Sequence, residues 1–378
     1  MVTRVSIARP VMEWAISRTR ESVDELKERE NFKRIDDWLA GKAQPTLKQA
    51  EALASAALIP FGYLLLDEPV DTRPPCPDFR TIGSKEVLEI SPELEETIYR
   101  NEQRLTWYAE YARLVGEPRP EGSGKYTIAN SPVKAAEAMR NVIGWPDSRK
   151  HGSRDRVGQL ANLLEDAGIL VMRNSVLGNN TQRRLHVEEF RGFTLLSDGY
   201  ALIFINSADF KSAQLFSLAH EYGHVLLGRP GITGQLNYDQ DIERWCNKFA
   251  AEFLISVRDL RARWAHSKDL DAVTNWAYKT FGVGTDPTVW SLVEDGAISR
   301  QDGQAYINNS RGRYDPKRVG SGGPDFVTLT KSRLGKRFLD AAVEARLDGV
   351  LDEEEFARQI GVSKTSTVNS VVEMVCGA

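Results

Sequence analysis

The sequence predicts an α+β protein that is mostly helical, with an N-terminal helical bundle, a central α/β core containing a small sheet, and a helical C-terminal region. Three observations support this prediction. Apolar residues recur at helical spacing over residues 9–66, two strand-length apolar runs flank a Ser-Asp-Gly turn near residue 198, and helical patterns resume beyond residue 265. A chain of 378 residues is too long to fold around one simple hydrophobic core, so we expect two or three domains.

Breaks in composition place the boundaries between these parts. Four prolines fall within residues 67–85, and a Pro/Gly-rich break spans residues 117–123. A long helix is expected between them, from Ser91-Pro92 to about Leu114. The expected parts are residues 1–68 for the bundle, 69–125 for the linker and long helix, 126–262 for the core, and 263–378 for the C-terminal region.

Local signals divide the N-terminal bundle into four short helices. The first contains Pro10–Ile16, and a capping box of Ser22 and Glu25 begins the second. A third helix is expected over Phe32–Leu39, and a fourth begins after Pro45 with one apolar face.

The central core is expected to combine helices with a few strands. A strand at Ile169–Met172 is followed by a hairpin of Gly192–Leu196 and Tyr200–Ile205. The expected helices are residues 132–144, 154–167, 207–227 and 241–255. Ser207 or Asp209 is expected to cap the third of these helices.

Composition is that of an ordinary globular protein. Hydrophobic residues make up 41% and charged residues 27%, with a net charge of -4 and a pI near 5.9. A dedicated nucleic-acid binder usually carries a basic excess, so DNA contact would require a local patch. Arg18, Arg20 and Glu21 come too early for a signal peptide, and no apolar run approaches the roughly 20 residues that span a bilayer. Three scattered cysteines without a CxxC pair suit a reducing compartment, so we expect a cytoplasmic protein with no membrane partner.

The most informative motif is the H-E-x-x-H pattern of His220, Glu221 and His224, inside a strongly apolar helix. Residues four apart lie on one helical face, so both imidazoles can bind one cation. Glu221 is displaced around the helix and can reach a water molecule beside the cation, which is the position of a general base.

A third protein ligand is expected from the next helix, which offers Asp241, Glu243, Glu252 and Asp259. Glu243 follows His224 by 243 − 224 = 19 positions, which is enough chain for a loop and a returning helix. Asn247 lies one turn after Glu243 and can hold the second nitrogen of a ligand histidine. Two histidines, one carboxylate and an open position are typical of a catalytic zinc site, although manganese or iron also suits these ligands.

A simpler interpretation treats His220 and His224 as ordinary helix residues. Two of the five histidines nevertheless fall at this spacing, and unpartnered buried bases are costly, so a metal explains them better. His186 and His266 lack a partner at helical spacing and are expected to be ordinary. Cys246 is expected to be a small core residue and Tyr222 a packing residue.

The segments Phe216–Gly228 and Ile242–Leu254 resemble the ImmA/IrrE family of metallopeptidases, and the strand pair upstream fits the core of that family. The resemblance implies a zincin-like metallopeptidase core that binds one Zn²⁺ per chain. It implies that His220, His224 and Glu243 are the zinc ligands and that Glu221 is the catalytic acid/base. The family usually places proline after the Phe-Ala-Ala-x-x-Leu segment, whereas this chain has Ser256 after Ile255, a departure that affects helix termination rather than chemistry.

The resemblance extends over nearly the whole chain. Three further segments are similar to longer family members that begin with an XRE-type helix-turn-helix domain: Gln44–Gln49, Pro60–Leu66 and Pro77–Arg80. Ser321–Asp325 and the helices after it resemble the C-terminal part of the same group. In such domains a recognition helix enters the major groove. The expected helix Phe32–Leu39 carries Asp36 and Asp37, which phosphates repel, so a bundle that contacts proteins is an equal alternative to DNA binding.

The implied function is a regulatory zinc endopeptidase that cleaves a helix-turn-helix repressor or an antitoxin-like partner. We expect an extended substrate to pair with the strand carrying Tyr200, Leu202 and Phe204 if that strand lies at a sheet edge, with Tyr238 as a further candidate contact. The main alternative is a toxin-like or transcriptional regulator that acts by binding a partner or DNA, with a structural or auxiliary metal. A housekeeping peptidase fits the additional domains less well.

Overall fold

The computed structural model describes residues 3–71, 90–145, 155–234, 239–310, 326–362 and 364–377. The chain divides into two compact units, Met1–Arg100 and Asn101–Ala378. In the described ranges, no helix has both the length and the apolar character needed to cross a lipid bilayer.

The first unit is a bundle of short helices. Its elements are α1 (Arg9–Arg18), α2 (Val23–Lys27), η1 (Glu30–Phe32), α3 (Ile35–Leu39), α4 (Leu47–Ala57), η2 (Phe61–Leu65) and the start of α6 (Pro92–Val115). The capping box of Ser22 and Glu25 is present, as predicted, and Thr46 with Gln49 forms a second one before α4. A partly buried ion pair of 2.8 Å between Arg18 and Glu95 ties α1 to α6.

The basic side chains of α2 and its neighbours are engaged by carboxylates within the same unit. Lys27 contacts Asp24 and Asp36, and Arg34 donates to Asp37. Helices α2 and α3 have only five residues each. The structure therefore shows a helical bundle whose short helices are linked by ion pairs.

The second unit is built on a four-stranded mixed sheet with the order β1-β5-β4-β6. The strands are β1 (Leu170–Asn174), β4 (Phe190–Ser197), β5 (Tyr200–Asn206) and β6 (Gly231–Gly234). β1 runs parallel to β5, while β4 is antiparallel to both β5 and β6. The β4–β5 turn has positive φ at Asp198 and Gly199, a two-residue geometry that matches strand twist. β2 (Val176–Leu177) and β3 (Asn180–Arg184) form a separate hairpin.

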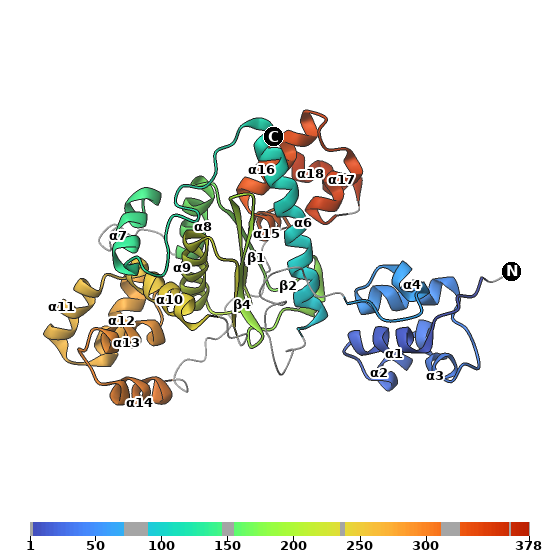
Figure 1. Ribbon diagram of the computed structural model, residues 1–378, viewed down its shortest axis with the longest axis horizontal. Helices are drawn as coiled ribbons and strands as arrows, with labels where there is room; N and C mark the ends of the chain where they lie inside the picture. The colour runs from blue at the N-terminus through green and yellow to red at the C-terminus, as the bar shows by residue number, and fades with distance from the viewer. Residues whose placement is uncertain are drawn as a thin grey trace. The chain divides into compact units, whose positions relative to one another are not determined.

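Helices cover both faces of the sheet (Figure 1), with α8 and α9 on one side and α6 and α15 on the other. The helices of this unit besides α6 are α7 (Pro132–Ile143), α8 (Arg156–Asp166), α9 (Lys211–Leu227), α10 (Gln240–Leu254), α11 (Val257–Ser267), α12 (Leu270–Phe281), α13 (Thr285–Glu294), α14 (Arg300–Ser310), α15 (Phe326–Leu334), α16 (Lys336–Leu347), α17 (Glu353–Ile360) and α18 (Thr365–Cys376). The mostly helical α+β class predicted from the sequence is therefore confirmed.

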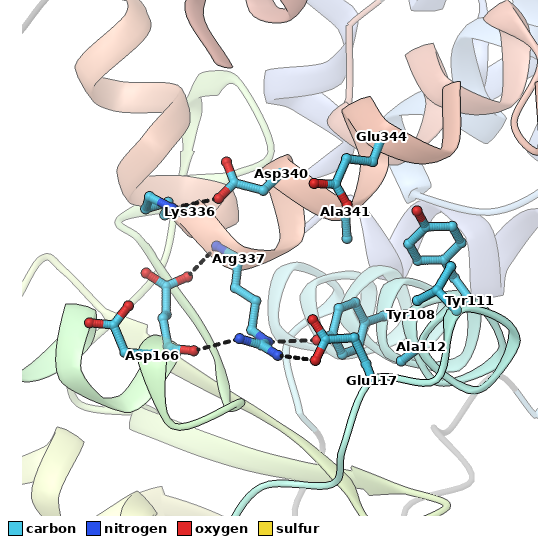
Figure 2. Close-up of a pocket in the computed structure, with 12 residues that line it drawn as sticks. Tyr108, Tyr111, Ala112, Glu117, Asp166, Lys336, Arg337, Asp340, Ala341 and Glu344 are labelled. Atoms are coloured by element: carbon cyan, nitrogen blue, oxygen red, sulfur yellow. Dashed lines mark hydrogen bonds and ion pairs between the residues drawn. The ribbon is translucent and has the colours of Figure 1, made fainter. Parts of the chain in front are cut away.

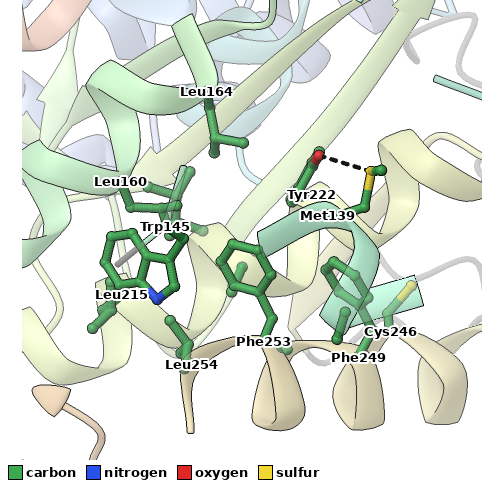
Figure 3. Close-up of a cluster of buried hydrophobic side chains, with 14 of the residues drawn as sticks. Met139, Trp145, Leu160, Leu164, Leu215, Tyr222, Cys246, Phe249, Phe253 and Leu254 are labelled. Carbon is green, nitrogen blue, oxygen red and sulfur yellow. Dashed lines mark hydrogen bonds between the residues drawn. The ribbon is translucent and has the colours of Figure 1, made fainter. Parts of the chain in front are cut away.

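The main core lies where α10 packs against both α9 and α7 (Figure 3). Tyr222 is fully buried with its ring edge-on to Phe249 and Phe253, and its hydroxyl donates to the sulfur of Met139. Trp145 stacks on Phe253 at 6.0 Å. Truncating a ring in such a core to alanine typically costs about 3–5 kcal/mol. This packing places α10 directly beside α9.

Two sequence-based expectations about this unit are wrong. β5 lies between β1 and β4, so the strand Tyr200–Asn206 is central and not at an edge. The N-cap residue of α9 is Phe210, without a side-chain cap, and neither Ser207 nor Asp209 takes that position. Hydropathy could not place β5, because a central strand and an edge strand buried on both faces show the same apolar run.

A separate pocket between α6, α8 and α16 is organised by Arg337 (Figure 2). Its guanidinium donates to Tyr108, to the backbone oxygen of Glu165 and to Glu117, at 2.6, 3.0 and 3.0 Å. Burial raises the pKa of Glu165 to about 7, and that carboxylate accepts the backbone N–H of Arg337 at the start of α16. The polar groups of this pocket therefore bond to one another and connect α16 to α6 and α8.

Candidate metal centre

Helix α9 places His220, Glu221 and His224 in the interior, with exposed fractions of 1%, 0% and 2%. The helix is apolar on nearly all sides because the sheet and α10 enclose it, and it ends at Gly228 with positive φ. Burying three titratable side chains together is costly unless each has a partner. The neighbours of these groups therefore define what the site can hold.

Close approach of α10 to α9 depends on Gly223. A Cβ atom at this position would lie 3.2 Å from the Cys246 sulfur and 3.3 Å from the Cys246 Cα. Contacts this short leave no room for a larger residue. The glycine thus lets α10 bring Glu243 and Asn247 to the histidines.

The three expected ligands converge on one point. His220 Nε2 and His224 Nε2 are 3.2 Å apart, and the Glu243 carboxylate lies 3.3 Å from the first and 3.2 Å from the second. Ligand atoms bound tetrahedrally at 2.0–2.1 Å from one zinc ion are about 3.3 Å from each other. The donor set and its spacing therefore fit zinc.

The second nitrogen of His220 supports this arrangement. Its Nδ1 lies 3.0 Å from Asn247 Oδ1, so a proton on Nδ1 can be donated to the amide oxygen. A neutral imidazole with its proton on Nδ1 has its lone pair on Nε2, which is the atom that faces His224 and Glu243. The structure thus brings Asn247 to the position expected of it.

Electrostatics in the site favour a bound positive charge. Burial alone would raise the pKa of Glu243, but the adjacent rings of His220 and His224 outweigh it and hold that pKa well below its usual range. Burial likewise opposes protonation of His224, and contacts with Cys246 and Glu243 nonetheless raise the pKa of its ring. A divalent cation would supply the positive charge that protons otherwise provide.

Cys246 is a competing ligand on geometric grounds. Its sulfur and one ring nitrogen from each of His220 and His224 all lie within 4.8 Å of one another. Glu243 is closer to both Nε2 atoms, and burial raises the pKa of the Cys246 thiol, which disfavours the thiolate form. The carboxylate is therefore the better third ligand, and Cys246 lies in the hydrophobic core as a small buried residue.

Glu221 has partners that the sequence did not suggest. Thr194 donates to Oε2 at 2.7 Å and Thr233 donates to Oε1 at 2.5 Å. Burial raises the pKa of Glu221, while both hydroxyls act in the opposite direction. Neither threonine belongs to a recognisable motif, and β6 itself was not predicted, because a four-residue strand rich in glycine lacks an apolar period.

β6 also covers the ring of His224. A Cβ atom at Gly231 would lie 2.7 Å from Cε1 of that imidazole, so only glycine fits this close approach. Of the ligand set, Glu243 is the most accessible, with 26% of its side chain exposed.

The predicted substrate-contact residues on β5 do not reach this site. Leu202 and Phe204 are buried, and the Phe204 ring stacks on Phe193 at 4.9 Å. Tyr200 is also buried, and its hydroxyl donates to the backbone oxygen of Glu117. The structure therefore does not bring these three residues to the candidate metal site, and their role in substrate binding stays a prediction. Tyr238 lies outside the described residues.

Residues 164–286 match the model of a family described as the IrrE N-terminal-like domain. This segment is therefore similar to a metallopeptidase domain. It comprises 123 of the 378 residues, about one third of the chain, and contains the H-E-x-x-H motif and Glu243. No curated protein and no solved structure matches the chain. The match supports the resemblance to the ImmA/IrrE family for the central segment, and it suggests a peptidase.

Replacing Asn247 with alanine is expected to weaken zinc binding by about 10–100-fold, because the Nδ1 proton of His220 loses its acceptor. Competition with a chromophoric chelator measures this change. Asp241→Ala serves as a control on the same helix, since its exposed carboxylate pairs with Arg244 instead. Equal zinc affinity in wild type and Asn247→Ala would show that Asn247 does not support the ligand.

Proposed function

We propose that this chain is a zinc-dependent metalloendopeptidase with a zincin-like core. The observation that carries the proposal is the convergence of His220 Nε2, His224 Nε2 and the Glu243 carboxylate within 3.3 Å of one another, with Glu221 one residue along the same helix. An open position beside two histidines and one carboxylate is typical of catalytic rather than structural zinc. Zinc is the first choice for this donor set, with manganese and iron as the alternatives.

The chemistry proposed is hydrolysis of a peptide bond. Zinc, when bound, supplies a Lewis acid that acidifies water and polarises a carbonyl group. Glu221 accepts the proton of the attacking water molecule and then delivers it to the leaving amine. The buried surroundings of Glu221 raise its pKa, which makes the protonated form accessible for the second step.

An extended substrate is proposed to approach the sheet at β6. This strand is at the end of the order β1-β5-β4-β6 and lies beside Glu221 and His224. Backbone hydrogen bonds to an edge strand give affinity without demanding one sequence, and side-chain pockets then give selectivity. In this arrangement β6, and not β5, pairs with the substrate.

We further propose that the target is a regulatory protein, such as a helix-turn-helix repressor or an antitoxin-like partner. The support is the similarity of the central segment to the IrrE N-terminal-like domain, together with a separate helical unit before it. A general digestive enzyme needs no such unit, whereas a selective one gains a second contact surface.

A binding protein remains the second candidate. The observation in its favour is the deep burial of Glu221, His220 and His224, of which no more than 2% is exposed. In this alternative the chain is a toxin-like or transcriptional regulator that acts on a partner or on DNA, and the metal has a structural or auxiliary role.

Co-incubation with a helix-turn-helix repressor encoded beside this chain's gene tests the proposal. Intact-mass spectrometry is expected to show two complementary fragments with the zinc-loaded protein and none after treatment with a chelator. A stable complex without fragments in the presence of zinc would favour the binding protein instead. A protein that purifies without any stoichiometric transition metal would count against both candidates.

A further inference from the structure

We propose that Thr194 and Thr233 are positioning residues that clamp the carboxylate of Glu221 in the orientation needed for proton transfer. The inference rests on the function proposed above and concerns residues outside the H-E-x-x-H motif. It assigns β4 and β6 a direct part in arranging the general base.

The two hydroxyls reach the two carboxylate oxygens separately. Thr194 Oγ1 lies 2.7 Å from Oε2, and Thr233 Oγ1 lies 2.5 Å from Oε1. The Thr194 hydroxyl is also 3.1 Å from the backbone oxygen of Glu221, but the carboxylate contact is the shorter and, being charge-assisted, the stronger. With both oxygens held, the plane of the carboxylate is determined.

The sheet register explains how two strands serve one side chain. Thr194 pairs with Gly231 and Gly192 pairs with Thr233, so the two threonines stand diagonally on the same face of neighbouring strands. Gly192 lies opposite Thr233 and two residues before Thr194, and a Cβ atom there would come within 3.2 Å of Glu221 Cγ. The missing side chain leaves the space that Glu221 occupies.

The hydrogen bonds from the two threonines also supply the donors that a buried carboxylate needs. Glu221 and Thr194 are both fully inaccessible to solvent, so no bulk water can satisfy the carboxylate. A buried acceptor without donors costs about 1–3 kcal/mol, and more when it is charged. If the two threonines had only a structural role, their loss would lower stability alone. A positioning role predicts in addition a loss of turnover in protein that remains folded and metal-loaded.

The expected loss of kcat follows from the orientation that the Glu221 carboxylate would lose. Displacing a catalytic group by about 1 Å can cost on the order of 100-fold in rate. A carboxylate released on one side can rotate about its last torsion, which is broad and only roughly two-fold. Each hydroxyl is therefore expected to affect kcat and to leave KM nearly unchanged.

The test compares Thr194→Val and Thr233→Val, which remove a hydroxyl at constant shape, with Thr194→Ser and Thr233→Ser, which retain it. The valine variants are expected to lower kcat by about 10–100-fold with KM little altered, and the serine variants to recover most of that loss. Thr288→Val is the control, because Thr288 is fully buried and donates to the Gly284 carbonyl away from the site. Metal content and the thermal unfolding midpoint verify that each variant is loaded and folded.

Infrared spectroscopy gives a readout that does not need turnover. The carboxyl band of Glu221, identified by subtracting the spectrum of Glu221→Gln, is expected to shift in both valine variants and to stay in place in the serine variants. An unmoved band, or valine variants with wild-type kcat beside an inactive Glu221→Gln, would overturn the clamp. If wild-type protein cleaves nothing, the proposed function fails, while the infrared comparison still decides whether the clamp exists.

Discussion

Replacing Glu221 with glutamine is expected to leave zinc bound and to lower kcat by about 10²–10⁴-fold, the range that general-base catalysis contributes. The amide keeps the shape of the side chain and can still bond to the hydroxyls of Thr194 and Thr233. It cannot accept a proton from water, so the loss falls on the chemical step. Cleavage assayed by mass spectrometry over a time course, beside metal analysis of the same sample, measures both effects.

Glu252→Gln is the matched control for this prediction. Glu252 is a buried carboxylate on α10 that accepts the backbone N–H of Val257 and lies 3.6 Å from Arg140. Its replacement removes a buried charge without touching the site, so kcat should stay near the wild-type value. Full biological activity in Glu221→Gln would refute the peptidase and favour the binding protein.

Replacing His224 with alanine is expected to abolish stoichiometric zinc binding. Only His220 and Glu243 would then face each other, and two protein ligands rarely hold zinc against competing chelators. Ligands that bind only the folded state stabilise it by mass action, by about 4 kcal/mol at a free concentration one thousand times Kd. The unfolding midpoint of the variant is therefore expected to lie at or below that of chelator-treated wild type, because the truncation also leaves a cavity in the core, and to be unresponsive to added zinc.

His186→Ala provides the comparison for the loss of a histidine as such. His186 is exposed and follows β3 in a loop outside the site, so metal content and unfolding midpoint should be unchanged. If His224→Ala retained one zinc per chain, the ligand set would have to be reassigned, with the Cys246 thiol as the next candidate.

Much of the candidate metal site could be predicted from the spacing of residues along the sequence. Residues four apart on a helix share a face, so the convergence of His220 and His224 follows from the motif alone. The returning helix with Glu243 and Asn247 was also predictable, because an amphipathic pattern and a short connection fix its approach. The order of the strands was harder to predict, since hydropathy does not distinguish a central strand from an edge strand when both are buried.

The sequence by itself determined the class of the fold, the helix that carries the motif and the positions of the candidate ligands, because these depend on short-range periodicity. Only the tertiary structure decided which strand stands at the edge and what holds Glu221. Thr194 and Thr233 are 39 residues apart and meet one carboxylate through the pairing of β4 with β6. Such a contact depends on strand register, on Gly192 leaving space and on Gly231 lying against His224. None of these follows from the period of a single segment, because register is set by the packing of the whole sheet.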